Sequence, residues 1–133
     1  MTGLRDLRAV QAEGEQALAG SDALIAVPSG QPVTLQEVIW NAPGAQGLTL
    51  RFRFVAPDIR AGGPVDFDTA MTDMLHLCQT YALPRLAEFG PAPEQVIISL
   101  ADAPLPFGES APEATQFFEA YRIEDGTCVW EIY

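Results

Sequence analysis

Few residues in this chain have the types and the spacing that chemistry requires. The single histidine, His76, follows Asp73 by three residues, a spacing at which the two side chains could share a proton or a metal ion. Two ligands are too few for a metal site, and we expect both side chains on the solvent-facing side of a helix. No nucleophile elbow, phosphate-binding loop or dinucleotide fingerprint is present. The residues therefore predict no metal, no cofactor and no catalytic residue, and they favour a non-enzymatic protein over an enzyme.

The two cysteines, Cys78 and Cys128, are too few for a disulfide scaffold and lack the spacing of a zinc site. We expect Cys78 on the buried face of a helix and Cys128 on the inner face of the last strand, so that they can meet in the core. An apolar surrounding of this kind disfavours a reactive thiolate. We expect two buried free thiols in a reducing compartment, and the alternative is a structural disulfide in an exported protein.

The composition indicates one compact, acidic, soluble domain. With 133 residues, of which 48% are hydrophobic and 19% charged, the chain can bury a single core. The formal net charge of -11 argues against nucleic acid and against anionic membrane surfaces as partners. No apolar run is long enough for insertion into a membrane. Charged residues interrupt the N-terminal stretch where an export signal needs an apolar run, so we expect a cytoplasmic protein, or a periplasmic one if the sequence lacks its signal.

The stretch 66–82 carries the clearest helical pattern, because its apolar residues recur every three or four positions. Asp66 is a suitable N-cap, and Pro84 disfavours helical geometry at Leu83. We therefore expect the helix to end near Leu83 or to kink and continue to Gly90. One face should be buried and the other should face solvent. The residues expected on the solvent-facing side are Thr69, Thr72, Asp73, His76, Gln79 and Thr80.

Alternating or β-rich composition predicts strands at 23–27, 48–56 and 95–101. The segment 33–40 suits either a strand or a short helix that begins with a capping box, and we favour the helix. A second capping box predicts another short helix at 111–116.

The dipeptide Asp125-Gly126 is a favoured two-residue hairpin turn and predicts a C-terminal β-hairpin. Its register places Ile123 opposite Cys128 and Tyr121 opposite Trp130 on the face that should pack against the helix. On the other face the predicted pairs are Arg122 with Val129, Ala120 with Glu131 and Phe118 with Tyr133.

These elements together predict an α+β fold, in which one main helix packs across an antiparallel sheet of four to five strands with a C-terminal β-hairpin. Residues 1–22 carry a loose amphipathic pattern, which Gly14 interrupts, and are expected to form a flexible or weakly helical arm. Residues 23–133 should form a single domain.

The outer face of the predicted sheet gathers three of the seven arginines. Arginine and aromatic side chains are enriched where proteins bind one another, so this face is the one we expect to bind another protein. The candidate binding residues are Arg51, Arg53, Arg122, Phe118 and Tyr133. In the competing interpretation, the N-terminal segment folds over this outer face and acids such as Glu131 neutralise its arginines. We favour this covered state of the outer face. The covering residues would then be Ile25, Val27, Val33, Val38 and Trp40.

The alternative function is that of a small-molecule-binding protein or small enzyme with a pocket between helix and sheet. Strand alternation places Glu119 on the apolar side of the sheet, where burial would favour its protonated form. Tyr121 and His76 complete this candidate pocket. The sequence does not define the oligomeric state, the partner or the ligand.

The chain from residue 27 onward resembles a family of short alphaproteobacterial proteins classed as a domain of unknown function. The runs that carry the resemblance are VPSGQPVTLQEVIWN, LTLRFRFVAP, DMLHLCQTYALPR, QVIISLADAP and ATQFFEAYRIEDGTCVWE. The resemblance covers most of the chain and implies no activity, cofactor or catalytic residue. Some members carry an automatic acetolactate synthase label, which the residues do not support. Thiamine-diphosphate enzymes of that kind need several hundred residues and a GDG-to-NN cofactor motif, whereas the nearest match here is the hairpin turn Glu124-Asp125-Gly126.

Overall fold

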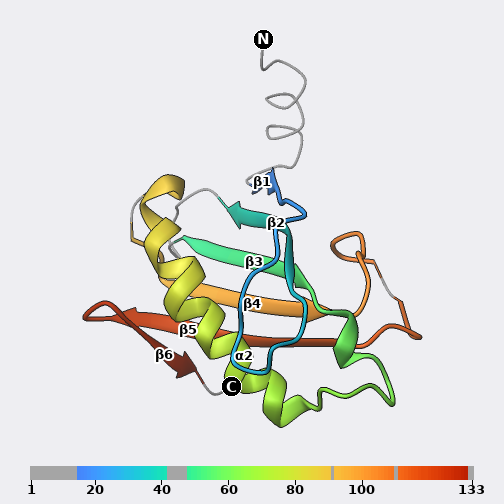
Figure 1. Cartoon of the computed structure of the whole chain (residues 1–133). Helices are drawn as coiled ribbons and strands as arrows, with labels where there is room; N and C mark the ends of the chain where they lie inside the picture. The colour runs from blue at the N-terminus through green and yellow to red at the C-terminus, as the bar shows by residue number, and fades with distance from the viewer. Residues whose placement is uncertain (1–14, 42–47, 91, 110, 132–133) are drawn as a thin grey trace.

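A six-stranded sheet with one long helix on one face forms the fold (Figure 1). The computed structural model describes residues 15–41, 48–90, 92–109 and 111–131. The strands lie in the sheet in their order along the chain, and every neighbouring pair is antiparallel except β3 and β4, which are parallel. The strands are β1 (Glu15–Ala19), β2 (Thr34–Asn41), β3 (Thr49–Val55), β4 (Gln95–Ala101), β5 (Gln116–Glu124) and β6 (Thr127–Glu131).

The predicted α+β class, the single main helix and the C-terminal hairpin are confirmed, but the sheet is larger than predicted. The parallel pair follows from the helix, because a chain that leaves β3, crosses the sheet as a helix and returns beside β3 must run in the same direction. The hairpin register is as predicted for the described residues, with Tyr121 opposite Trp130 and Ile123 opposite Cys128.

The helix is continuous over 23 residues, but its hydrogen-bonding geometry changes twice along its length. It begins as α2 (Phe67–Leu77), widens into a π-helix, η2 (Cys78–Ala82), and tightens into a 3-10 helix, η3 (Leu83–Phe89). Asp66 caps the start by accepting a hydrogen bond from the Thr69 amide at 2.9 Å, and Gly90 ends the helix with a φ of 125°. The predicted continuation to Gly90 is therefore confirmed. Within the part of the chain that the structure describes, no helix combines the length and apolar character that a bilayer crossing requires.

The core lies between the helix and one face of the sheet. The alternating apolar residues of β3, which the sequence predicted, all point toward the helix and are buried. The largest buried side chains of this core include Leu50, Phe52, Phe54, Met74, Leu77, Ile98, Leu100 and Tyr121. The segment 20–33 crosses the same face of the sheet beside the helix (Figure 1). It adds Val27 and Val33 to the core.

Asp73 attaches the segment 20–33 to the helix. Its side chain is 0% exposed and accepts hydrogen bonds from the Ser29 amide at 3.0 Å, the Ser29 hydroxyl at 2.6 Å and Gln31 Nε2 at 2.7 Å. The prediction of a solvent-facing Asp73 is wrong, because a distant loop covers this side of the helix. No hydrogen bond or ion pair joins Asp73 to His76 among the described residues. The proposed Asp73 and His76 pair is therefore not formed.

Four local predictions differ from the structure. Residues 23–27 form a loop in place of a strand. In the segment 33–40, residues 34–40 belong to strand β2 in place of a helix, and residues 111–116 turn directly into β5 without a helix. Residues 15–19, expected within a flexible or weakly helical arm, form β1, while residues 1–14 lie outside the described residues. Strand β2 has a neighbour on each side, so two ladders of hydrogen bonds outweigh the capping-box signal.

Cys78 and Cys128 form a disulfide that joins the helix to β6, with their Cα atoms 6.3 Å apart. Both residues are buried, as predicted, but the expectation of free thiols is wrong. Gln79 reinforces the junction, since its Oε1 accepts from the Cys128 amide at 3.1 Å and its Nε2 donates to the Gly126 carbonyl at 3.3 Å. The helix is thereby tied to the sheet at its last strand.

Replacing both cysteines with alanine should lower the free energy of unfolding by roughly 4 kcal/mol, because the disulfide closes a loop of 50 residues in the unfolded chain. Urea unfolding with and without reductant measures this loss. Reductant should destabilise the wild type and leave the double variant unchanged. Equal stability of the two proteins under oxidising conditions would contradict a structural role for the disulfide.

Candidate functional site

The face of the sheet that points away from the helix, which we call the outer face, carries polar and aromatic side chains. Arg51 and Arg53 alternate with the core residues of β3 and therefore point to this face, as predicted. Strand pairing sets two rows of side chains across it. One row is Glu37, Arg53, Ser99 and Phe118, and the next is Ile39, Arg51, Ile97 and Ala120.

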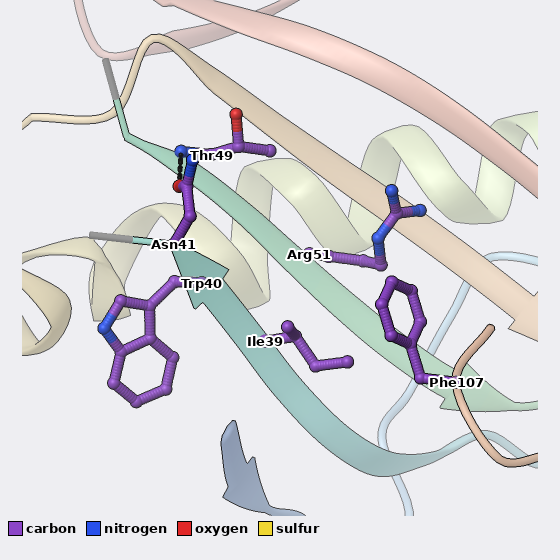
Figure 2. A pocket seen from close by; sticks show the side chains of 6 residues that line it. All are labelled: Ile39, Trp40, Asn41, Thr49, Arg51 and Phe107. Atoms are coloured by element: carbon purple, nitrogen blue, oxygen red, sulfur yellow. Dashed lines mark hydrogen bonds between the residues drawn. The ribbon is translucent and has the colours of Figure 1, made fainter. Parts of the chain in front are cut away.

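The loop of residues 102–109 folds over part of the outer face and brings Phe107 against the arginines. The ring centroid of Phe107 lies 5.3 Å from Cζ of Arg51 and 5.4 Å from Cζ of Arg53, within the range of cation–π attraction. Figure 2 shows the ring beside Arg51, with Thr49 on the same strand and Ile39 on the neighbouring strand β2. Phe107 lies in a proline-rich stretch without a periodic pattern, so the sequence analysis did not single it out.

Arg53 fixes this loop to the sheet. Its side chain is 5% exposed. Its guanidinium forms an ion pair with Glu37 and donates from Nη2 to the Leu105 carbonyl at 2.9 Å. Gln36 donates to the same carbonyl at 2.8 Å. A buried guanidinium with a carboxylate and a carbonyl as partners is held in one position. Arg53 is therefore a positioning residue for the loop.

The covering expected from the N-terminal segment is wrong. Val27, Val33 and Val38 lie in the core on the helix side of the sheet, and Ile25 and Trp40 pack against that core. The outer face is covered in part by residues 102–109 instead, and it stays open on both sides of Phe107.

Two hollows flank Phe107 on the outer face. The larger, which we call the outer hollow, has a volume of about 350 Å³, and the smaller has about 120 Å³. Phe107 is 44% exposed and Phe118 is 64% exposed, so two aromatic rings border the outer hollow with much of their surface in water. The outer hollow is lined by Arg51, Arg53, Ser99, Pro106, Phe107, Gly108, Glu109, Gln116 and Phe118, and the smaller by Ile39, Trp40, Asn41, Thr49, Arg51 and Phe107 (Figure 2).

A protein-family model described as a family of unknown function (DUF6497) matches residues 7–133. The chain belongs to this family. Neither the comparison with curated proteins nor that with solved structures finds a match. The predicted membership in a family of unknown function is thus confirmed, and the family description assigns no activity.

The remaining candidate residues of this DUF6497 member do not line the outer hollow. Arg122 also points to the outer face, but it is exposed and paired with Glu124 of its own strand. The hydrogen bond that the guanidinium donates to this carboxylate raises the pKa of Arg122. Tyr133 lies outside the described residues. The structure thus brings Arg51, Arg53 and Phe118 together and places Arg122 apart from them.

The helix-to-sheet pocket predicted for this DUF6497 chain involves Tyr121, Glu119 and His76, which have different surroundings. Tyr121 is buried in the core, and this burial, aided by the charge of Glu119, raises the pKa of its hydroxyl. Glu119 accepts a hydrogen bond from Trp130 Nε1 at 2.8 Å, and His76 lies half-buried on the helix. Among the described residues, no three histidine, cysteine or acidic side chains come close enough to hold a metal ion.

Replacing Arg53 with methionine should release the loop 102–109 and lower the free energy of unfolding by about 2–3 kcal/mol, because Glu37 and the Leu105 carbonyl lose a partly buried partner. Urea unfolding measures the stability, and hydrogen exchange of the loop amides measures the release. Arg122→Met is the matched control, with a stability and an exchange profile close to wild type. Unchanged exchange in Arg53→Met would contradict the positioning role.

Proposed function

We propose that this chain is a non-enzymatic protein-interaction domain that binds another protein through the outer face, at the hollow bordered by Phe107 and Phe118. The observation that carries the proposal is the pair of exposed aromatic rings beside Arg51 and the buried Arg53. Aromatic and arginine side chains dominate the binding energy of protein interfaces when they surround a pocket that a partner can fill. The partner is expected to place an apolar side chain between the two rings.

The construction of the outer face also supports a protein partner. The sheet beneath it is held rigid by the helix on its other side, and Arg53 holds the loop with Phe107 in place. A preorganised surface loses little conformational entropy on binding. The net charge of -11 disfavours nucleic acid as a partner. It favours a protein whose surface around the contact with the hollow is neutral or basic.

Replacing Phe118 with serine should remove the partner from a pull-down of the tagged protein in its native cells. Leu24→Ser is the matched control, because Leu24 is 73% exposed and the segment that carries it lies on the helix side of the sheet. Mass spectrometry should identify a protein that the wild type and Leu24→Ser retain and Phe118→Ser loses. The purified partner should then bind Phe118→Ser at least about tenfold more weakly than the wild type.

The proposal fails if a folded Phe118→Ser variant, with the circular dichroism and melting temperature of the wild type, retains the same partner. It fails equally if the wild type retains no specific protein. A triple substitution of Arg51, Arg53 and Arg122 with glutamate would be a poorer test, because loss of the buried Arg53 would disturb the fold as well as the surface.

The disulfide supports a second proposal, that the chain folds in an oxidising compartment such as the periplasm and not in the cytoplasm. Disulfides persist in such compartments and are rare where thiols are kept reduced. Cells lysed directly into denaturant that contains an alkylating agent and no reductant should yield protein with no label on Cys78 or Cys128 by mass measurement. Two added labels would place the chain in a reducing environment.

A further inference from the structure

A further hollow of about 220 Å³ lies on the helix side of the sheet, between the end of the helix and strands β1 and β2. Its apolar wall comes from the strands and from the 3-10 segment, and includes Leu18, Leu35, Val38 and Phe89. Its polar lining includes Arg85 and Glu88 of η3. This helix-side hollow shares no lining residue with the outer hollow, so it is independent of the proposed docking face.

Arg85 is held in place on one side only. Its guanidinium lies 3.6 Å from the ring centroid of Tyr81, and its Nη1 donates to the Tyr81 carbonyl at 2.8 Å. Tyr81 belongs to the π-helical segment η2, a geometry that is common at functional sites. Guanidinium carries five N–H donors, and no other acceptor among the described residues takes one from Arg85. A fixed guanidinium with donors to spare is suited to a carboxylate.

Glu88 follows Arg85 by three residues within the 3-10 segment. In a 3-10 helix, residues three apart lie above one another on the same side, so both charges border the same hollow. The two side chains nevertheless form no ion pair with each other among the described residues. The hollow therefore offers one positive and one negative group beside an apolar wall.

We infer that the helix-side hollow binds a free amino acid with an apolar side chain. The carboxylate would accept hydrogen bonds from Arg85, the ammonium would face Glu88, and the side chain would lie against the apolar wall. The volume is below the roughly 300–1,000 Å³ of pockets for drug-sized ligands, which suits a ligand of this size. A zwitterion has no net charge, so the net charge of -11 does not repel it.

Fluorescence titration with L-leucine and L-phenylalanine tests the inference. Trp40 stacks edge-on against Phe89 of the hollow with centroids 4.8 Å apart, so its emission reports on occupancy. The Trp130→Phe variant removes the other tryptophan. A saturable change below about 10 mM is expected, with a matching rise in melting temperature. 4-Methylpentanoate and isoamylamine, which each lack one of the two charges, should bind at least about tenfold more weakly.

Arg85→Gln should weaken binding of the amino acid at least about tenfold, whereas Arg60→Gln, at an exposed arginine away from the hollow, should bind as the wild type does. Phe118→Ser should also bind normally, which separates this inference from the proposed docking function. Full binding by a folded Arg85→Gln variant, equal affinity for 4-methylpentanoate, or no response to either amino acid would overturn the inference.

Discussion

In the described part of the chain, one long helix must cover a sheet of six strands, and this imbalance shapes the rest of the structure. A helix about 10 Å wide spans only two or three strands spaced about 4.8 Å apart. The flanks of the helix are therefore closed by other means. On one side the segment 20–33 fills the gap and is held by Asp73; on the other side the disulfide and Gln79 tie the helix to β6.

The same imbalance leaves the outer face without a helix. The side chains on an uncovered face must shield the strand backbones from water and still face solvent. Long arginine side chains do both, because their stems are apolar and their heads are charged. Arg53 is buried, and it holds the loop that carries the ring of Phe107. The hollow bordered by Phe107 and Phe118 remains because this loop covers only part of the outer face.

Strong local patterns allowed the sequence to predict the centre of the fold. Alternation in β3, helical spacing from Asp66 onward and the Asp125-Gly126 turn each depend on residues close together in the chain. They predicted the core, the helix and the hairpin register correctly, together with the outward direction of the arginines.

The features that sequence reasoning missed depend on contacts between distant residues. Asp73 looks like a surface residue until Ser29 and Gln31, 44 and 42 residues away, are brought to it. Strand β2 looks like a capped helix until β1 and β3 pair with it on both sides. Phe107 stands in a proline-rich loop with no periodic pattern, so nothing near it in the sequence indicates that Arg53 would hold it over the sheet.

The strand order has a consequence for the route by which the chain folds. Four of the five strand pairings join antiparallel neighbours in the chain, and each of these can form from a local hairpin or short connection. The parallel pairing of β3 with β4 must wait for residues 56–94 to cross the sheet. Because closing a long loop costs entropy before its contacts form, this crossover should set the refolding rate.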